Sequence, residues 1–432
     1  MIMLKVVKVR LYPTNQQQES LAKAFGSCRW LWNRFLALTQ ETYKQTGKGL
    51  SRYELQKQFS CIKKEYEWLG ETYSQCLQVV CLNLTRSFIN FFEKRASFPR
   101  FKSKHGKQSL SYPQNVKIKG DMLVFPKLGE IYAKIHRPIE GSIKTVTISK
   151  NKAEQYFASI LLEDGKELQK PILRLRSVQV TEGKAVGLDM GLTDFCITSE
   201  GSKFENPRWL EKHEKNLKNK QKDLSRKQKG SNNRNKARIK VAKVHNKISR
   251  SREDIQHKLS RRIVNENQIV ICENLNIKGM VKNHCLAKSI HQVGWGQFQT
   301  MLKYKCEQEG KVYLEIDRFF PSSKTCSHCL NVVDSLPLDI RQWECPKCHT
   351  RHDRDINAAQ NIREEGLRIL SLGTSESASC PDVRPGRGGR KKSTTRLSVG
   401  DEAPPSTNNG GVVHDRISCP KKKEIDGSTK RW

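Results

Sequence analysis

The spacing of apolar residues at the start of the chain predicts one strand followed by helices. Residues Val7–Leu11 alternate apolar and basic side chains, which is typical of a half-buried strand, and Pro13 ends this strand. Thr14 and Asn15 are candidate caps for a following helix. That helix has apolar residues three and four positions apart, at Leu21, Ala24, Phe25, Cys28, Leu31, Trp32, Phe35 and Leu38. The same spacing predicts a second helix, with Leu77, Val80, Cys81, Leu84, Phe88 and Phe91.

From about Val116 to Glu163 the apolar period changes to two, and turn residues separate the runs. Gly120-Asp121 and Lys150-Asn151 are typical of hairpin turns, and Tyr156–Leu162 is typical of a strand. We therefore expect a small β-rich module here, as a barrel that includes the N-terminal strand.

Apolar runs in the second half of the chain predict buried strands, and two of them end on an acid. These two are Lys184–Asp189 and Ile269–Glu273. A further strand is expected at Val312–Ile316, after a helical segment around Phe298–Lys305. The residues from Asp355 to Ile362 indicate the start of a helix, with Asp355 as a candidate N-cap.

Between Pro207 and Arg262 lies a long polar stretch that predicts two antiparallel helices, with a break at Gly230-Ser231-Asn232. Their dense Lys and Arg surface suits phosphate binding, and a solvated charged helix pair is the alternative. The residues of the thin apolar seam are Leu210, Leu217, Leu224, Val241, Val244, Ile248, Ile255 and Leu259.

The charge balance favours a polyanionic partner. The 432 residues include 79 Lys and Arg against 44 acids, a formal charge of +35. Nucleic acid is the usual polyanion, and a membrane surface is the alternative. Without a spanning apolar stretch or a cleavable leader, we expect a soluble intracellular protein. Beyond about Ser371 the composition of Ser, Gly, Pro, Arg and Lys predicts a disordered tail.

Four of the 14 cysteines are grouped in a pattern that indicates zinc. Cys326-x-x-Cys329 and Cys345-x-x-Cys348 can each present two thiolates to one ion, with fifteen residues between the pairs. Four soft sulfur ligands make a closed tetrahedral site, so this zinc should be structural. An iron–sulfur or redox pair is the alternative. Most other cysteines, such as Cys28, lie among apolar residues, where a reduced thiol behaves as a small hydrophobe.

Asp189, Glu273 and Asp355 form a candidate catalytic centre. An acid at a strand end is usually a turn former or a salt-bridge partner, so each one alone says little. If the strands are neighbours, the three acids bring anionic oxygens to one place, and hard oxygen ligands select Mg²⁺ or Mn²⁺. Two such ions about 4 Å apart can activate a water and stabilise the leaving oxygen of a phosphodiester. Gly187 and Gly191 leave room for a backbone to approach.

The residues around these acids resemble the three RuvC motifs of the TnpB family. TnpB proteins are RNA-guided DNA endonucleases of bacterial and archaeal insertion sequences, related to type V CRISPR effectors. The likeness covers roughly residues 4–370. The matching segments are Gly187–Gly191, Cys272–Leu275 and His352–Ile362, with Gly294–Phe298, Phe320–Cys326, Phe98–Lys104 and Leu11–Thr14.

The resemblance implies a multidomain α/β protein with a β-rich module. Its parts would be an RNase H-like (RuvC) nuclease core, an inserted four-cysteine zinc ribbon, and an N-terminal β-barrel-like wedge domain with a helical recognition insert. The implied parts are a wedge-like β module (residues 1–12 and 106–180), a helical recognition insert (13–105), a RuvC-like core (181–321) with a basic helical pair (207–262), a zinc ribbon (322–350), the last core motif (351–370) and a disordered tail (371–432).

The resemblance also implies that Asp189, Glu273 and Asp355 are the metal-binding catalytic acids. Asp355 is preferred to Asp353 because the family motif places its acid directly before the x-Asn-Ala-Ala run. The implied partners are a guide RNA and target double-stranded DNA, in the cytoplasm, and the protein itself reads only a short flanking motif that Gln78 faces. Further implied contacts with nucleic acid are Arg100, Lys102, Lys104, Arg226, Lys227, Arg234 and Arg238.

Leu330 departs from the family, in which Gly usually follows the second ribbon cysteine, and this puts the geometry of that turn in question. The tail also has a family explanation, since the guide RNA scaffold is transcribed from DNA that overlaps the end of the gene. Deleting residues after Ser371 should then leave cleavage intact when guide RNA is supplied in trans.

The sequence thus favours an RNA-guided, metal-dependent DNA endonuclease associated with transposition. A guide-independent transposase, a non-cleaving nucleic-acid-binding regulator and a zinc-ribbon transcription or ribosomal factor are the alternatives. The three acids count against a pure binder, which has no need of them.

Overall fold

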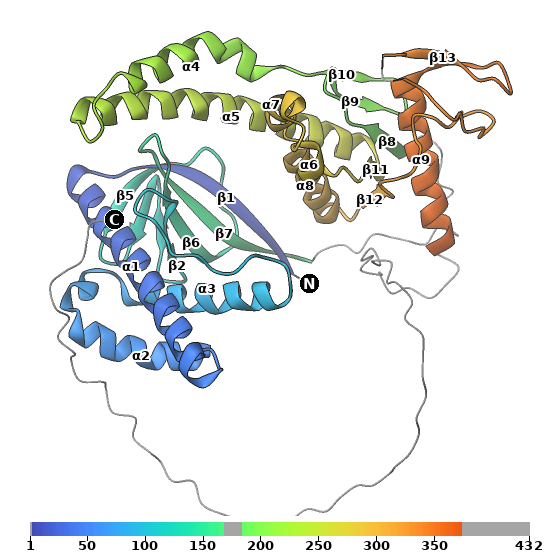
Figure 1. Ribbon diagram of the computed structural model, residues 1–432. Helices are drawn as coiled ribbons and strands as arrows, with labels where there is room; N and C mark the ends of the chain where they lie inside the picture. Colours follow the sequence, from blue (N-terminus) through green and yellow to red (C-terminus); the bar gives the residue numbers. More distant parts are fainter. Residues whose placement is uncertain (1, 168–183, 338, 374–432) are drawn as a thin grey trace, which may run out of the picture.

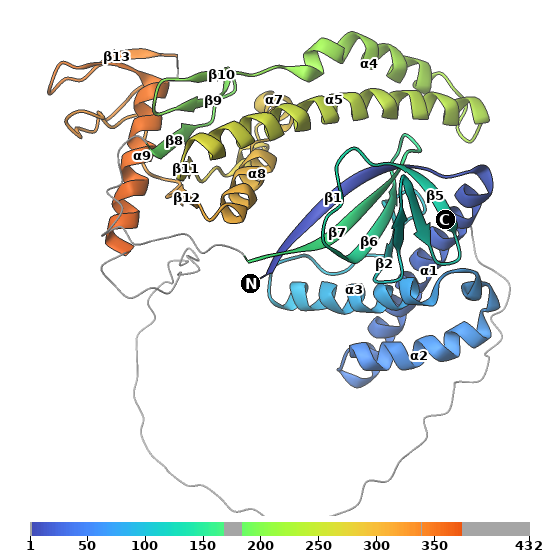
Figure 2. The same ribbon diagram turned by 180° about the vertical axis from the view of Figure 1, so that it is seen from behind.

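The computed structural model describes residues 2–167, 184–337 and 339–373, which form two lobes joined by a long helical hairpin (Figure 1). The first lobe is built on a seven-stranded sheet and the second on a five-stranded sheet. Seen from behind, the hairpin extends from above the first lobe into the second (Figure 2). Residues 374–432 of the predicted tail, and residues 168–180 of the predicted β module, lie outside the described residues.

The N-terminal strand β1 (Ile2–Tyr12) lies in the middle of the seven-stranded sheet. It pairs antiparallel with β7 (Tyr156–Glu167) on one side and with β5 (Gly129–Lys134) on the other. From Val7 to Leu11 its more and less buried residues alternate, with Val9 and Leu11 buried and Lys8 exposed, so the strand pattern predicted from the sequence is confirmed. The remaining strands are β2 (Gln108–Tyr112), β3 (Lys117–Lys119), β4 (Met122–Phe125) and β6 (Ser142–Lys150), in the order β2-β6-β7-β1-β5-β4-β3.

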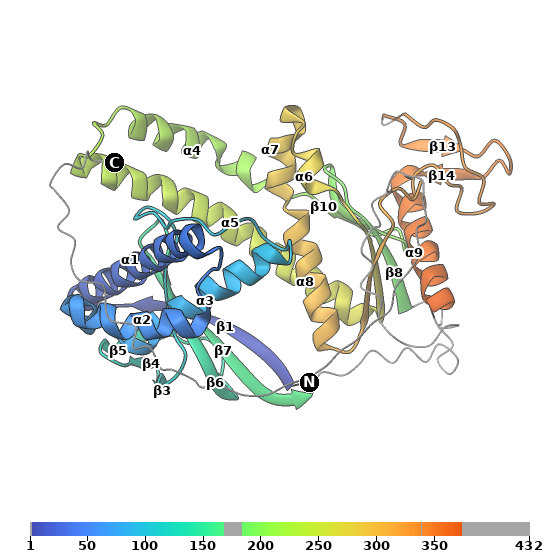
Figure 3. The ribbon, with the colours of Figure 1, turned by 60° about the horizontal axis from the view of Figure 1, so that its bottom comes forward.

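Three helices pack together on one side of this sheet and share its apolar core (Figures 1 and 3). They are α1 (Asn15–Thr46), α2 (Arg52–Glu65) and α3 (Ser74–Phe92), with a short 3-10 turn η1 (Glu67–Glu71) before α3. Thr14 caps α1 in a reciprocal pair of hydrogen bonds with Gln17, which decides between the two caps predicted. The hydrophobic pattern did not predict α2, because its buried residues are only Leu55, Phe59 and Ile62.

The predicted helical pair is present as α4 (Trp209–Ser225) and α5 (Asn232–Glu266), which lie side by side (Figure 3). Leu217, Val241 and Ile248 are buried in the thin apolar seam between them. Ser231 caps α5 by accepting a hydrogen bond from the Arg234 amide. The far end of α5 buries Leu259 and Ile263 in the core of the second lobe, so one helix ties the hairpin to that lobe.

The five-stranded sheet has the order β10-β9-β8-β11-β12, and β8, β11 and β12 run parallel. Its strands are β8 (Ala185–Asp189), β9 (Asp194–Thr198), β10 (Lys203–Glu205), β11 (Ile269–Glu273) and β12 (Val312–Ile316). Helix α9 (Arg354–Gly373) packs on one face, and α5 and α8 (Trp295–Gln308) share an apolar core with the other. Because both faces are covered, β8 and β11 are apolar at every position up to their final acids.

The small remaining elements are α6 (Ile277–Met280), α7 (His284–Val293), and the strands β13 (Gln342–Glu344) and β14 (Arg351–Asp353) of the cysteine-rich segment. Among the helices of the described residues, not one is long and apolar enough to cross a membrane. The cysteines in those residues are all free, and most are buried.

Candidate active site

The fold brings the three predicted acids to one edge of the five-stranded sheet. Asp189 ends β8 and Glu273 ends β11, and these neighbouring strands are parallel with Leu188 in register with Cys272. The carboxyl ends of parallel strands point the same way, so the two acids leave the sheet together. Asp355 lies in the first turn of α9, the helix that packs on β8. Tertiary structure thus collects residues that are far apart in the chain.

The charges of the other two acids act on Asp189. Burial is the largest cause that raises the pKa of Asp189, to about 8, and the charges of Glu273 and Asp355 raise it further. Burial likewise raises the pKa of Glu273, while the hydrogen bond from Ser322 Oγ, 2.8 Å from Glu273 Oε1, lowers it. A buried carboxyl that is repelled by two neighbouring acids is suited to a divalent cation, since the cation removes the repulsion.

Asp355 and Asp353 have different partners, and this separates their roles. Asp353 Oδ1 accepts hydrogen bonds from the amides of Asp355 and Ile356, at 3.1 and 3.2 Å, so Asp353 caps α9. The prediction that Asp355 is the N-cap is therefore wrong, because the helix begins one position after the acid that caps it. Lys203 Nζ also binds Asp353, at 2.7 Å. Partial burial acts to raise the pKa of Asp353, but Lys203 and the two amides hold it below its ordinary value.

Arg341 is a partner of the acid cluster that the sequence did not reveal. Its Nη1 lies 3.1 Å from Asp355 Oδ1, and its carbonyl accepts a hydrogen bond from the Arg354 amide. Arg341 directly precedes β13, so the cysteine-rich segment contributes a cation to the edge of the sheet. Residues fourteen positions apart meet here only because the segment folds back on itself.

Gly187 lets α9 approach the sheet closely enough to place Asp355. A methyl group on Gly187 would lie 2.1 Å from the Ala359 carbonyl oxygen and 2.6 Å from the Arg363 amide nitrogen. The backbone of α9 therefore rests directly on β8. This confirms the expectation that Gly187 leaves room for a backbone, and Gly191 is similarly tight against the Asp194 carbonyl, at 2.7 Å.

The four predicted cysteines meet in a second candidate metal centre. The sulfurs of Cys326, Cys329, Cys345 and Cys348 all lie within 4.8 Å of one another, as no other group of three or more ligand side chains does within the described ranges. The pairs Cys326–Cys348 and Cys329–Cys345 have Sγ atoms 3.6 Å apart. Hydrogen bonding with Thr350 lowers the pKa of Cys348, which favours the thiolate that binds metal. Four soft donors in a compact group fit a structural zinc.

Leu330 adopts the backbone conformation that its family's glycine would provide. Its φ is 61°, and His349, at the equivalent position after Cys348, has φ 57°. The turn after each cysteine pair thus uses the left-handed backbone region without glycine, the residue that adopts it at least cost.

The basic residues predicted to contact nucleic acid lie on the first lobe and on the α4–α5 hairpin. Arg234 Nη1 donates to the carbonyls of Leu224 and Lys227, at 3.0 and 2.8 Å, and so closes the turn between α4 and α5. Arg238 joins α5 to the first lobe through Glu154. The ammonium of Lys102 lies 3.6 Å from the centroid of the Trp32 ring. Arg226 ends α4, while Lys227, Arg100 and Lys104 are exposed.

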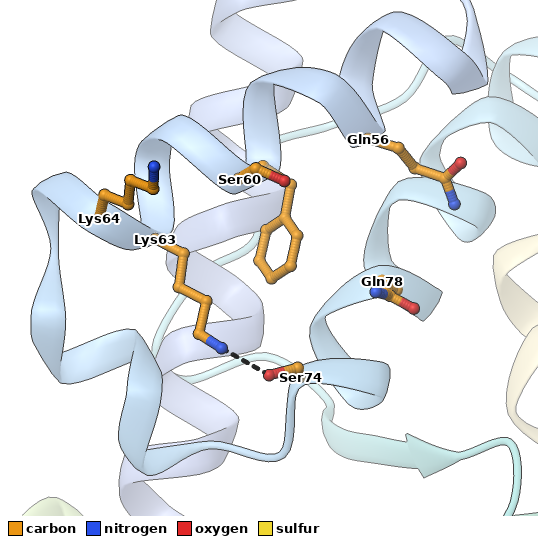
Figure 4. Close-up of a pocket in the computed structure, with 7 residues that line it drawn as sticks. Gln56, Ser60, Lys63, Lys64, Ser74 and Gln78 are labelled. Carbon is orange, nitrogen blue, oxygen red and sulfur yellow. Dashed lines mark hydrogen bonds between the residues drawn. The ribbon is translucent and has the colours of Figure 1, made fainter.

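Gln78 lines an open hollow of about 620 Å³ between α2 and α3. Figure 4 shows Gln56 on α2 and Gln78 on the facing helix α3. The side chain of Lys63 reaches from α2 to Ser74 of α3. Lys63 Nζ donates to Ser74 Oγ at 2.7 Å, which fixes one wall of the hollow. Amide groups that can both donate and accept hydrogen bonds are suited to reading base edges.

A second basic group, at the junction of the sheet with α5, was missed by the sequence analysis. The charged groups of Lys8, Arg10 and Arg250 each lie 5.0 to 5.5 Å from the centroid of the Phe157 ring. Burial, and then the charge of Arg250, lower the pKa of Arg10 despite an opposing contribution from Tyr12. The alternation in β1 placed Lys8 and Arg10 on one face, but only the fold places Arg250 against them.

Models of known families match three stretches of the chain. Residues 148–284 match the IS605 OrfB family described as "Probable transposase". Residues 295–362, from α8 to the middle of α9, match the "Cas12f1-like, TNB domain" family. Residues 1–48 match an IS605 OrfB family described as "Helix-turn-helix domain", although β1 and the single helix α1 occupy most of that stretch.

Curated relatives match over most of their own length. A "Putative RNA-guided DNA endonuclease" of Streptomyces pristinaespiralis is 36% identical over 403 residues, covering 92% of this chain and 98% of the relative. The "Putative RNA-guided DNA endonuclease InsQ" of Escherichia coli K12 is 29% identical and covers 88% and 96% of the two chains. The "TnpB-like protein L79" of Acanthamoeba polyphaga mimivirus is 20% identical, over 84% and 73%.

A solved structure described as "Cryo-EM structure of the Cas12f1-sgRNA-target DNA complex" shares the fold. Its protein chain superimposes with a TM-score of 0.51 at 12% identity, covering 84% of this chain and 99% of that one. The arrangement of α/β lobes is therefore one that this chain shares with that Cas12f1 protein.

Proposed function

The chain belongs to the TnpB family of IS605 OrfB proteins, and from this premise we propose that it is an RNA-guided, divalent-metal-dependent DNA endonuclease associated with transposition. The observation that carries the proposal is the meeting of Asp189, Glu273 and Asp355 at one sheet edge, where the charges of Glu273 and Asp355 act on the buried carboxyl of Asp189. The RNA guide and the DNA substrate of this proposal are taken from the names of the two bacterial relatives.

Asp189, Glu273 and Asp355 would hold the divalent ions, and Mg²⁺ or Mn²⁺ fits their hard oxygens. Such ions, when bound, activate a water and stabilise the leaving oxygen of the phosphodiester. The protein's own contribution is to hold these carboxylates in place. Ser322 orients the Glu273 carboxylate, and Asp353 fixes the first turn of α9 so that Asp355 faces the strand ends.

The basic surfaces of the first lobe and of the α4–α5 hairpin are suited to bind nucleic acid. We infer that the α4–α5 hairpin and the Lys8, Arg10 and Arg250 group bind RNA and heteroduplex backbone, because phosphates neutralise the positive charges that gather there. The hollow beside Gln78 is suited to read the short flanking DNA motif. In this proposal the first lobe acts as wedge and recognition domains and the second as a RuvC-like core.

The decisive test uses the full-length protein with its co-purified RNA, matched duplex DNA and Mg²⁺. Wild type should cleave, Asp189→Ala should not, and Glu205→Ala, an exposed acid on β10 of the same sheet, should cleave like wild type. Equal cleavage by wild type and Asp189→Ala contradicts the assigned centre. Cleavage that survives RNase treatment before assembly instead identifies a guide-independent transposase, and tight RNA binding without any cleavage identifies a regulator.

A further inference from the structure

Phe319 is the most exposed large apolar side chain in the part of the chain that the structure describes. It is 86% exposed, in the turn between β12 and the four-cysteine segment. Its neighbour Phe320 is partly buried and packs against the core that contains Ile316 and Ile362. A chain that packs one of two adjacent aromatic rings against its core and leaves the other in water keeps an apolar surface open at that place.

The turn that carries Phe319 is fixed to the strand that carries Glu273. The Phe319 amide donates to Asp317 Oδ1 at 2.8 Å, and the Phe320 amide closes the turn on the Asp317 carbonyl. Arg318 Nη2 donates to Asn274 Oδ1 at 3.0 Å. Ile316, three residues before Phe319, is the register partner of Glu273, so the turn that carries Phe319 begins at the sheet edge where Glu273 lies.

The following residues are fixed to the helix that carries Asp355. Asn361 Nδ2 donates to the carbonyls of Ser322 and Thr325, at 2.8 and 2.6 Å. Asn357 Nδ2 donates to the Thr325 carbonyl at 2.7 Å. Both asparagines are almost completely buried, with Asn357 1% and Asn361 2% exposed. The loop is therefore held from both sides, by the elements that supply Glu273 and Asp355.

A rigidly held exposed ring costs little further entropy when it binds a flat partner, because its backbone is already ordered. The partner beside a phosphodiester-cleaving centre is the nucleotide whose phosphate is attacked. Every nucleobase has a flat π face that stacks on an aromatic ring, whatever its sequence. Stacking needs the base to be unpaired, which matches a strand displaced from its duplex.

We propose that Phe319 is a positioning residue, whose ring stacks on an unpaired base next to the scissile phosphate and so fixes that phosphate over the carboxylates. This inference rests on the proposed function and names how its substrate strand is held. Because stacking on one ring is independent of base identity, Phe319 sets the geometry of cleavage and not the choice of target.

The first experiment compares cleavage by wild type, Phe319→Ala and Phe319→Trp, each assembled with guide RNA. Phe319→Ala should lower the cleavage rate at saturating DNA roughly 5- to 150-fold, as expected for losing one base stack, with the Kd for matched DNA unchanged. Phe319→Trp, which keeps an aromatic face, should restore the rate. Tyr43→Ala removes an exposed aromatic residue, 59% exposed on α1, and should cleave like wild type.

A scan of abasic sites separates stacking from a general structural effect. One abasic position beside the cut should slow wild type as much as Phe319→Ala does, and should slow Phe319→Ala no further. If the two losses multiply at every position, the base does not stack on Phe319 and the inference is wrong.

A readout without cleavage uses Asp189→Asn protein with 5-iodouracil placed at successive positions near the cut. Ultraviolet light should crosslink one position to Phe319, and Phe319→Ala in the same background should lose that crosslink. No crosslink to Phe319 at any position, or a dimer of the protein that Phe319→Ala disrupts, overturns the inference. If wild type cleaves no guided DNA at all, the proposed function falls together with this inference, whereas equal cleavage by wild type and Phe319→Ala removes the inference alone.

Discussion

The two candidate metal centres of the second lobe are built in opposite ways. The cysteine centre takes its ligands from two short turns, within residues 326–348, and its four sulfurs already lie within 4.8 Å. The acid centre takes its ligands from two strands and a helix spread over residues 189–355. One centre holds its own segment together, whereas the other is held in place by a core that folds around it.

The difference in construction predicts a difference in energy. Four thiolates of a short segment gain their structure from the ion, because little apolar surface is buried there beyond Trp343. The ionised carboxylate of Asp189 instead destabilises the folded state, since burial and the charges of Glu273 and Asp355 raise its pKa to about 8. Arg341, at the edge of the cysteine segment, connects the two centres through its ion pair with Asp355.

The largest effect should come from breaking the cysteine centre. Cys345→Ser removes one of four ligands, so the zinc content of the purified protein should fall to background and residues 322–353 should become sensitive to protease. Structural zinc sites are worth on the order of 10 kcal/mol, so this segment should not stay folded. Glu273→Gln is the contrast, because it should keep both zinc and protease resistance. Protease resistance of Cys345→Ser without zinc would show that the segment folds by packing.

The next effect is a gain in stability from neutralising the acid centre. Between the ordinary carboxyl pKa and about 8, an unfolded chain ionises Asp189 while the folded chain keeps it protonated. The free energy of unfolding of wild type should therefore fall as pH rises through that window, in buffer without added divalent metal. Asp189→Asn cannot ionise, so above pH 8 it should be more stable than wild type by roughly 5 kcal/mol, because each unit of pKa shift is worth about 1.4 kcal/mol.

Thermal unfolding at pH 4 and pH 8 checks this prediction. The difference in Tm between Asp189→Asn and wild type should be small at pH 4 and large at pH 8. An equal difference at both values would mean that the carboxylate charge is not what strains the fold.

A smaller loss of stability should follow from Gly187→Ala. The added methyl group meets the backbone of α9 at 2.1 Å, so helix and strand must separate, at a cost of about 1–3 kcal/mol or more. Cleavage should fall as well, because α9 carries Asp355. Gly49→Ala is the matched control, since its methyl group would lie 3.7 Å from Thr39 Cγ2, an ordinary contact. An unchanged Tm for Gly187→Ala would contradict the close packing of β8 and α9.

The smallest effect should be a gain at Leu330. Glycine relieves the strain of φ 61°, so Leu330→Gly should stabilise the cysteine segment by about 1 kcal/mol and slow the loss of zinc to a chelator. Val332→Gly, at an exposed position without positive φ, should speed that loss. Faster loss of zinc from Leu330→Gly would mean that the leucine side chain makes a contact worth more than the strain.

The sequence predicts a centre more completely when its ligands lie in one short segment than when they come from distant elements. The spacing of Cys326, Cys329, Cys345 and Cys348 was sufficient to predict their centre, because the ligands are local. The strand ends at Asp189 and Glu273 were also correctly located, since buried parallel strands leave continuous apolar runs. The hydrophobic pattern could not decide whether those two strands are neighbours, because strand order depends on the tertiary structure.

Residues that act through distant contacts were missed for the same reason. Ser322 and Arg341 belong to the acid centre only through folds of the chain that local spacing does not record. The capping role of Asp353, which the sequence assigned to Asp355, depends on side-chain direction within two residues. The exposure of Phe319 beside a partly buried Phe320 is likewise a property of the turn and not of its composition.

The central claim is that three distant carboxylates form one catalytic centre, and non-additivity tests it most directly. The measurement is the rate of guided DNA cleavage in Mg²⁺ by Asp189→Asn, Glu273→Gln, Asp355→Asn and the triple variant. Each single variant should lose on the order of 10⁴-fold, and the triple variant should be no slower than the singles, because groups that act as a unit fail together. A single variant that cleaves at the wild-type rate, or losses that multiply in the triple variant, would contradict the account.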